Sequence, residues 1–188
     1  YPDASAGFWD YGPLGTSLRN RFVDLWRREL VRRDGMIEID GSQIMSKKVF
    51  EASGHLESFA DPIASCMKCG VILRVDRFIS GRIGQIIPEG LAEAEYDRML
   101  AENSLKCPSC GGEFSSTRKF NMMFKVAIGP AGEEAFLRPE TCQSIFVDYP
   151  RLIRVMRDKL PLAVAQFGKS FRNEISPRQS LIRLREFY

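Results

Sequence analysis

The chain has 188 residues, of which 44% are hydrophobic and 27% are charged, and its formal net charge at pH 7 is +3. These proportions are typical of an ordinary globular protein and exclude a disordered, collagen-like or coiled-coil chain. The sequence has no apolar run of the roughly 18 to 20 residues that a membrane span needs, and no secretory pattern at its N-terminus. We therefore expect a cytoplasmic protein with one main core and room for a small second module.

The first predicted element is an amphipathic helix from Thr16 to Arg33, which follows an aperiodic loop with the sequence GFWDYGPLG. Gly35 is placed to end this helix, and Met36 to Asp40 alternates as a half-buried strand does. A short helix is expected around residues 49–53. The apolar residues of the long helix recur at steps of three and four, at Leu18, Phe22, Leu25, Trp26 and Leu30.

Two CxxC pairs enclose a middle segment, residues 66–112, which we interpret as an inserted module between residues 1–65 and 113–188. The cysteines of the pairs are Cys66, Cys69, Cys107 and Cys110. Four thiolates at this spacing can close a tetrahedron around zinc, and a site without an open coordination position would be structural. A zinc site lost to mutation, or a redox pair, is the alternative. Between the pairs we expect a strand over residues 71–79 and a helix over residues 89–102.

The C-terminal third is predicted to hold a helix over residues 140–159, interrupted at Pro150, and then strands at 162–167, 170–175 and 181–188. We expect the protein to continue beyond Tyr188, because a natural domain rarely stops inside a strand. From Arg151 onward, nine basic residues face three acidic ones, which suits ATP or RNA. For residues 151–159 a solvated helix face is an equal alternative.

Two isolated residues and several missing motifs narrow the chemistry. His55 is the only histidine, so we expect it to hydrogen-bond in a structural role or at the edge of a substrate site. Cys142 stands apart from the CxxC pairs and is interpreted as a small buried hydrophobe. The sequence has no Walker loop, GxGxxG or GxSxG motif. If ATP binds, side chains must hold its phosphates.

A strand, loop and strand near the C-terminus could supply those side chains. Side chains alternate along a strand, so Arg172 and Glu174 share one face, while Arg183, Arg185 and Phe187 share a face of the returning strand. Guanidinium groups pair with phosphate oxygens, a carboxylate accepts from the adenine amino group, and a ring stacks on the base. The alternative is an exposed, salt-bridged hairpin with a buried phenylalanine.

The pattern Arg172-x-Glu174, a loop, and Arg183-x-x-x-Phe187 resembles motif 2 of the class II aminoacyl-tRNA synthetases. The longer string FRNEISPRQSLIRLREF resembles the glycyl-tRNA synthetases in particular, as do GFWDYGPLG, EASGH with FADP, FNMMF and LRPETCQSIF. Together these strings cover nearly the whole chain. The CxxC pairs and the stretch around Arg74 are similar to the archaeal and eukaryotic type.

This resemblance implies an α+β fold, in which an antiparallel sheet flanked by helices carries a small zinc-binding insert. It implies a homodimer built partly on the long N-terminal helix, and the ATP-dependent formation of glycyl-adenylate with Mg²⁺, followed by transfer to tRNA(Gly). The third motif and the anticodon-binding domain of the family would lie beyond Tyr188, so this stretch alone is not assumed to be active. A synthetase-like accessory protein that binds nucleic acid or a partner without catalysis is the alternative.

The resemblance also implies roles for individual residues. Arg172 would hold the ATP α-phosphate and the glycine carboxylate, and Glu140 would bind the glycine ammonium, with Arg74 and Phe187 as further substrate contacts. Phe187 would also stack the adenine base. The residues expected at ATP are Arg172, Asn173, Glu174, Ile182, Arg183, Leu184, Arg185, Glu186 and Phe187. The substrate carboxylate is itself the nucleophile, so catalysis would consist of positioning and charge stabilisation, for which Arg172 is the catalytic candidate.

The chain departs from the family pattern at three positions. Cys142 and Ser144 replace the usual Ala and Gly after Glu-Thr, and Ser180 replaces the usual Gly after Pro-Arg-Gln. The added side chains are expected to affect the shape of the pocket and the mobility of the loop.

Overall fold

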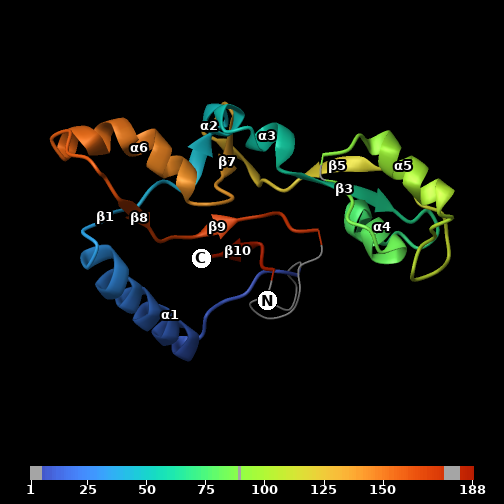
Figure 1. Ribbon diagram of the computed structural model, residues 1–188, viewed down its shortest axis with the longest axis horizontal. Coiled ribbons are helices and arrows are strands. Elements are labelled where there is room, and N and C mark those ends of the chain that lie inside the picture. The colour runs from blue at the N-terminus through green and yellow to red at the C-terminus, as the bar shows by residue number, and fades with distance from the viewer. Residues whose placement is uncertain (1–5, 89, 176–182) are drawn as a thin grey trace. The chain divides into compact units, whose positions relative to one another are not determined.

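The computed structural model describes residues 6–88, 90–175 and 183–188 (Figure 1). The chain divides into two compact units. Unit 1 consists of Tyr1–Ser53 and Met123–Tyr188, and unit 2 is the continuous segment Gly54–Met122. Unit 2 contains the whole segment between the two CxxC pairs and extends beyond it on both sides. Among the described residues, no helix is long and apolar enough to cross a membrane.

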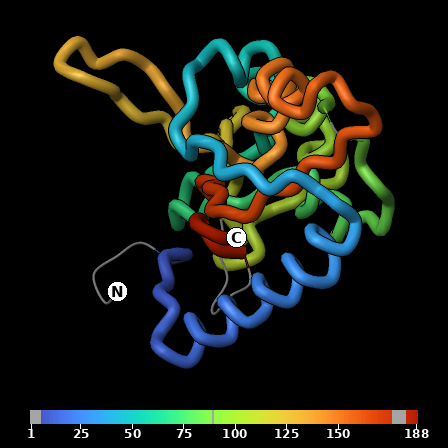
Figure 2. The backbone as a smooth tube through the Cα atoms, turned by 90° about the vertical axis from the view of Figure 1, so that its left-hand side faces the viewer, coloured from blue at the N-terminus to red at the C-terminus, as the bar shows by residue number. Residues whose placement is uncertain are grey.

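The long N-terminal helix is confirmed in unit 1. Helix α1 (Pro13–Trp26) continues into a π-helical stretch, η1 (Arg27–Arg32), and is seen as the blue helix of Figure 2. Pro13 stands at the start, where its missing N–H costs nothing, and Gly35 follows the end with a φ of +63°. The apolar stripe is largely exposed: the side chains of Leu18 and Phe22 are 71% and 67% accessible.

An antiparallel sheet of three strands forms much of unit 1. Strand β7 (Glu133–Leu137) lies in the centre, between β2 (Ile44–Ser46) and β6 (Lys125–Ile128). Helix α2 (Lys47–Ala52) follows β2 directly and buries Phe50 against Phe136 of β7, with their rings 6.1 Å apart. The predicted short helix at 49–53 is therefore confirmed, although it starts earlier.

Four further short strands lie in the described part of unit 1. Strands β9 (Ser170–Phe171) and β10 (Glu186–Phe187) pair antiparallel, as expected. Strand β1 (Ile37–Ile39) pairs with β8 (Val164–Gln166) in parallel. The parallel pair departs from an all-antiparallel sheet, and it is possible because a long stretch of chain joins the two strands.

The expected interruption at Pro150 is wrong. Helix α6 (Cys142–Val155) passes through Pro150 without ending. The missing N–H leaves the carbonyl of Phe146 without its helical partner, but this side of the helix is open, since Phe146 is 75% exposed. Water can therefore replace the lost bond. Arg154 stabilises the next turn, because its Nε donates to the Pro150 carbonyl at 3.0 Å.

Unit 2 is a second antiparallel sheet covered by helices. Strand β3 (Ala60–Ser65) lies between β4 (Ile72–Arg74) and β5 (Arg118–Asn121), and a short helix, α3 (His55–Ser58), precedes β3. Helix α5 (Glu93–Glu102) confirms the predicted helix, although it begins later. The core consists of Ala64, Val75, Ile79, Tyr96 and Leu100.

The strand predicted over residues 71–79 is wrong beyond Arg74. The chain turns there into helix α4 (Val75–Ile83). Val75, Phe78 and Ile79 follow a helical spacing of three and four residues, and both Val75 and Ile79 are fully buried in the unit 2 core. The apolar run therefore forms one buried helix face, which an alternating strand could not provide.

Candidate functional site

The candidate nucleotide site of unit 1 is built on the β9–β10 hairpin. Phe171 pairs with Glu186 and Ser170 with Phe187, and the Arg172 N–H donates to the Arg185 carbonyl at 2.9 Å. This register places residues 172 and 174 opposite residues 185 and 183. The predicted antiparallel pairing is therefore confirmed, but β9 and β10 are shorter than the predicted strands 170–175 and 181–188, and residues 176–182 lie outside the described residues.

The hairpin brings four of the expected residues together in pairs. The Arg172 guanidinium lies over the Phe187 ring, with its Cζ 5.3 Å from the ring centroid. Arg183 Nη2 lies 3.5 Å from Glu174 Oε2, and the Glu174 side chain is only 12% exposed. The two pairs together supply two guanidinium groups, a carboxylate and an aromatic ring. Such a set can contact phosphates, a purine edge and a purine face.

Arg185 contacts the backbone. Its Nη2 donates to the Glu174 carbonyl at 2.9 Å, its Nη1 donates to the Ala6 carbonyl, and its guanidinium lies 5.8 Å from the Phe8 ring. The Arg185 N–H also donates to the Gly7 carbonyl. Arg185 therefore ties the aromatic N-terminal loop to the hairpin, a contact that the sequence did not reveal.

The other residues expected at ATP differ in their surroundings. Glu186 forms an ion pair with Lys169, and this carboxylate raises the pKa of the Lys169 ammonium above its ordinary value. Leu184 is buried at 6% exposure, and Asn173 is half-buried. Ile182 lies outside the described residues. Its predicted contact with ATP, like the other individual roles, stays a prediction.

Glu140 is the expected ammonium ligand and lies in the loop between β7 and α6. Its Oε1 accepts two hydrogen bonds, from Gln143 Nε2 at 2.7 Å and from Cys142 Sγ at 3.0 Å. Just before it, the Pro139 carbonyl accepts from Arg172 Nε at 3.2 Å. The backbone of this loop therefore contacts the guanidinium that is expected to hold the other end of glycine.

Cys142 does more than fill space. It is half-buried, and its thiol donates to the Glu140 carboxylate. Burial, together with this negatively charged acceptor, raises the pKa of the Cys142 thiol to about 11. The interpretation of Cys142 as a simple buried hydrophobe is therefore incomplete. Gln143, which is 5% exposed, is a second partner of Glu140 that sequence reasoning missed. Both neighbours are contained in the LRPETCQSIF string.

Arg74 belongs to unit 2 and is held there by two carboxylates. Its Nη1 lies 2.7 Å from Asp61 Oδ1 and its Nη2 lies 2.8 Å from Asp76 Oδ2. Arg74 therefore joins strand β3 to the first turn of α4. His55, in α3, lies against Phe59 with the two rings 5.5 Å apart. The structure shows structural contacts for both residues, and their contact with substrate stays a prediction.

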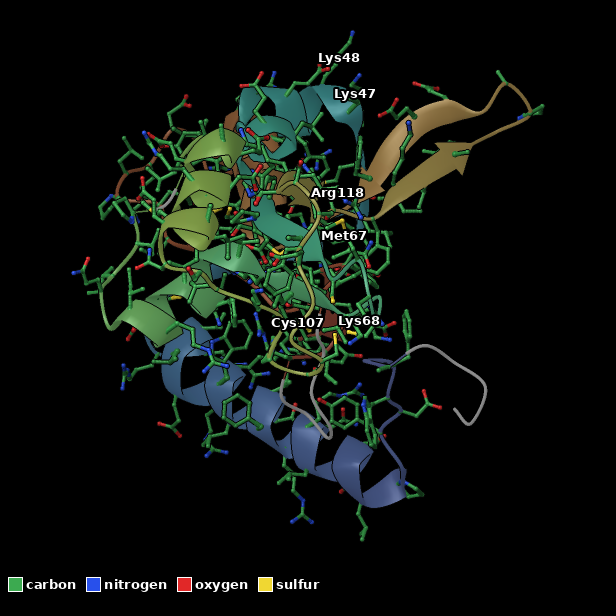
Figure 3. The ribbon with its side chains drawn as sticks, turned by 90° about the vertical axis from the view of Figure 1, so that its right-hand side faces the viewer. Lys47, Lys48, Met67, Lys68, Cys107 and Arg118 are labelled. Atoms are coloured by element: carbon green, nitrogen blue, oxygen red, sulfur yellow. The ribbon has the colours of Figure 1, made fainter. Side chains whose placement is uncertain are left out.

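The four paired cysteines of unit 2 converge. Their Sγ atoms all lie within 4.8 Å of one another, with Cys66 and Cys110 at 3.5 Å and Cys69 and Cys107 at 3.6 Å. Figure 3 shows Lys68 and Cys107 beside yellow sulfur atoms. The predicted convergence of the two pairs is therefore confirmed.

The two CxxC pairs have the same backbone geometry. Gly70 N–H donates to the Cys66 carbonyl and Gly111 N–H donates to the Cys107 carbonyl, each at 2.9 Å. Both glycines have a positive φ, +73° and +69°, which other residues rarely adopt. The backbone N–H of Cys69 lowers the pKa of the Cys66 thiol, which favours the thiolate form that binds metals. Four sulfur donors in this arrangement fit a tetrahedral zinc ion.

Known proteins resemble this chain in fold and in sequence. No family model matches the chain. A solved structure, the RNA binding domain of threonyl-tRNA synthetase from Cryptosporidium parvum Iowa II, aligns with all of this chain and 31% of its own, with a TM-score of 0.55 and 18% identity. That likeness concerns the fold alone, and it defines a fold that occurs in a tRNA synthetase.

The sequence relatives are more specific. The chain is 48% identical to the glycine–tRNA ligase of Methanothrix thermoacetophila and 49% identical to that of Pyrococcus horikoshii, over 184 residues in each case. The glycine–tRNA ligase of Thermococcus gammatolerans is 47% identical. Each alignment covers 97% of this chain and 32% of the relative. The chain is thus similar to about a third of these glycine–tRNA ligases, and the predicted resemblance is confirmed at that level.

Proposed function

We propose that the full-length protein is a glycine–tRNA ligase of class II, which activates glycine with ATP and transfers it to tRNA(Gly). The observation that carries the proposal is the linkage of Arg172 to both halves of the site. Its guanidinium lies on the Phe187 ring, and its Nε contacts the carbonyl of Pro139, the residue before Glu140. The names of the relatives support the same reaction.

In the proposed reaction a glycine carboxylate oxygen attacks the α-phosphorus of ATP. A bond forms between that oxygen and phosphorus, the bond to the bridging oxygen breaks, and pyrophosphate leaves with the electron pair. Arg172 holds the carboxylate and the α-phosphate together and stabilises the charge that develops on the phosphorus oxygens. Arg183 approaches the terminal phosphates, Glu174 accepts from the adenine amino group, and Phe187 stacks on the base. Mg²⁺ would neutralise the leaving pyrophosphate.

Selection of glycine follows from the size of the substrate. A pocket that binds the ammonium through Glu140 and leaves no room at the α-carbon excludes larger amino acids by overlap. The two donors from Cys142 and Gln143 orient the Glu140 carboxylate for this contact. No editing site is needed, because no proteinogenic amino acid is smaller than glycine.

Two further features are part of the proposal. The four cysteines of unit 2 hold one structural zinc ion, supported by their convergence and spacing. The protein is a cytoplasmic homodimer in which α1 meets a second copy, supported by the exposed apolar side chains of Leu14, Leu18 and Phe22. The basic excess after Arg151 suits the approach of tRNA.

The test is glycine-dependent exchange of pyrophosphate into ATP by the full-length protein. We expect Arg172→Ala to lower kcat/KM by an amount that corresponds to about 3 to 4 kcal/mol of lost transition-state stabilisation, as for the loss of a group that stabilises transition-state charge. Phe187→Ala should weaken ATP binding by about 1 to 3 kcal/mol, as for a lost base stack. Arg98→Ala, which removes an exposed arginine 3.8 Å from Glu95, is the control and should change neither. A wild-type protein that exchanges with no amino acid would favour the non-catalytic accessory protein.

A further inference from the structure

Arg138 has no role in the proposed reaction, yet it is the largest fully buried side chain among the described residues, with 0% exposure. It follows β7 directly and precedes Pro139. Among the described residues its guanidinium has no ion pair with a carboxylate, and its Nη2 has no hydrogen-bond acceptor. Burial lowers the pKa of this guanidinium, the charge of Asp40 acts in the opposite direction, and the group stays protonated.

A buried cation that forms no direct ion pair is costly for stability even with the charge of Asp40 acting on it, and an apolar side chain of similar volume would cost less. The contacts of Arg138 therefore call for a reason other than stability. Its Nε donates to the Lys169 carbonyl at 2.8 Å and its Nη1 donates to the Gly41 carbonyl at 2.9 Å. The Gln166 amide satisfies both of its ends when its oxygen faces Arg138 Nη1 and its nitrogen faces Ser144 Oγ.

These bonds join three segments that are far apart in the sequence. The guanidinium links the end of β7 to the loop after β1, at Gly41, and to the turn between β8 and β9, at Lys169. The backbone of Arg138 repeats the linkage: its N–H donates to the Gln43 carbonyl and its carbonyl accepts from the Phe171 N–H, both at 2.9 Å. Arg138 is thus the point where these segments meet.

Both proposed glycine ligands are attached directly to this point. Glu140 follows Arg138 by two residues. Arg172 follows Phe171, whose N–H is bonded to the Arg138 carbonyl, and Arg172 Nε contacts the Pro139 carbonyl. The separation of the Glu140 carboxylate and the Arg172 guanidinium therefore depends on how Arg138 holds the two segments that carry them. Glycine is the shortest amino acid, so this separation decides whether its ammonium and carboxylate are held together.

The Arg138 guanidinium lies directly against the backbone of Gly168. A Cβ added at Gly168 would lie 2.3 Å from Arg138 Nη2, so any side chain there must displace the guanidinium. The φ of Gly168 is not in the left-handed region, so the requirement for glycine comes from this close approach. Gly168→Ala is therefore a second way to move Arg138 that keeps its charge and its donors.

We propose that Arg138 is a positioning residue that sets the distance between Glu140 and Arg172, and thereby the fit of glycine. This inference rests on the proposed function. It predicts that displacement of Arg138 acts on glycine more than on ATP. Both proposed glycine ligands depend on Arg138, whereas of the proposed ATP contacts only Arg172 does, since Arg183, Glu174 and Phe187 are not bonded to the Arg138 side chain.

The experiment compares full-length wild type with Arg138→Lys, Arg138→Met and Gly168→Ala in glycine-dependent pyrophosphate exchange, with ATP binding titrated directly. We expect kcat/KM for glycine to fall about 100-fold in each variant, as for a misplacement of about 1 Å, with a raised KM and little change in ATP affinity. Lysine should not rescue, because one nitrogen cannot reproduce the fork that reaches both carbonyls. The double variant Arg138→Lys/Gly168→Ala should be no worse than the worse single variant, because both changes break the same contact.

Arg154→Met is the matched control, since Arg154 also donates through Nε to a backbone carbonyl but is exposed. It should keep wild-type kinetics. If the Arg138 variants only lose melting temperature and active fraction, with glycine KM unchanged, Arg138 is structural and the inference is wrong. Should Arg138→Met fail to fold, Arg138→Lys and Gly168→Ala decide in the same way. An inactive wild type would overturn the proposed function and this inference with it, whereas an active wild type with unaffected variants overturns the inference alone.

Discussion

The two units hold their sites in opposite ways. In unit 2 the four cysteines of the proposed metal site come from the two CxxC pairs of one continuous segment, and their sulfur atoms converge within 4.8 Å. In unit 1 the candidate site is assembled from the loop after β7 and from the β9–β10 hairpin, with Arg138 bonded to segments near both. One site lies within a single segment of the chain, and the other is assembled from separate segments.

The two arrangements predict different effects of substitutions. A four-cysteine site couples metal binding to the folding of its own module, so its loss should be large and confined to that module. A distributed site depends on the placement of a few groups, so its variants should change kinetics while the fold persists.

Loss of the metal should be the largest effect. We expect Cys66→Ser to release zinc and unfold unit 2, because structural zinc contributes on the order of 10 kcal/mol to the folding of such modules. Hydrogen exchange followed by mass spectrometry should show lost protection across Gly54–Met122 and retained protection in unit 1. The control Cys142→Ser should keep one zinc per chain. Retention of both zinc and protection in Cys66→Ser would contradict the metal site.

The buried ion pair of unit 2 comes next. Asp61→Asn removes a carboxylate that is 6% exposed and lies 2.7 Å from Arg74, while Asp76 still holds the guanidinium. We expect a loss of about 3 kcal/mol from the free energy of unfolding of unit 2, the lower end for a broken buried pair. Denaturant unfolding monitored by hydrogen exchange measures it.

The exposed Glu95→Gln is the control for this change, and it should alter the unfolding of unit 2 only slightly. Equal stability of Asp61→Asn and wild type would show that the pair contributes nothing. The same series decides the predicted substrate contact of Arg74: an Arg74→Met variant that raises the glycine KM, where Asp61→Asn does not, would support that contact.

In unit 1 the expected effect is smaller and kinetic. Glu140→Gln keeps the shape of the side chain but removes the charge that is proposed to bind the glycine ammonium. We expect kcat/KM for glycine to fall by an amount that corresponds to about 1.5 to 3 kcal/mol of lost transition-state stabilisation, because a charge-assisted hydrogen bond is lost. The ATP affinity should be nearly unchanged. Exchange kinetics with glycine, alanine and serine, beside ATP titration, measure the effect.

Glu133→Gln, an exposed change on β7, is the control and should be silent. If Glu140→Gln keeps wild-type glycine kinetics, or loses ATP and glycine binding equally, Glu140 is a structural residue.

The smallest effect concerns the thiol beside Glu140. Its pKa is raised from an ordinary 9.0 to about 11, so the neutral thiol is favoured in the folded state. The resulting contribution to stability is present below pH 9 and is lost as the pH rises through 11. Alkylation of Cys142 in the zinc-loaded protein should therefore have its midpoint near pH 11, and in a free peptide near pH 9. A midpoint near 9 in the folded protein would show that the thiol is not held by the carboxylate.

Several features could be predicted from the amino-acid sequence alone. The long N-terminal helix and the pairing of β9 with β10 were predicted from patterns within short stretches of chain. The convergence of the cysteines was predicted from the two CxxC motifs, although the contacting cysteines lie 38 and 44 residues apart. The resemblance to the glycyl-tRNA synthetases was also readable, because long strings carry it. Each of these features has a recognisable signal in the sequence, namely a periodicity, a motif or a long matching string.

Other features depend on contacts between segments that are far apart in the sequence. The run after Arg74 became helix α4 because Val75 and Ile79 bury their side chains in the unit 2 core, and α6 passed through Pro150 because that side of the helix is open. The sequence also could not show that Arg138 is buried, since its acceptors at Gly41 and Lys169 lie 97 and 31 residues away. Whether a cation is exposed or buried depends on which distant carbonyls surround it, and only the folded chain brings those carbonyls together.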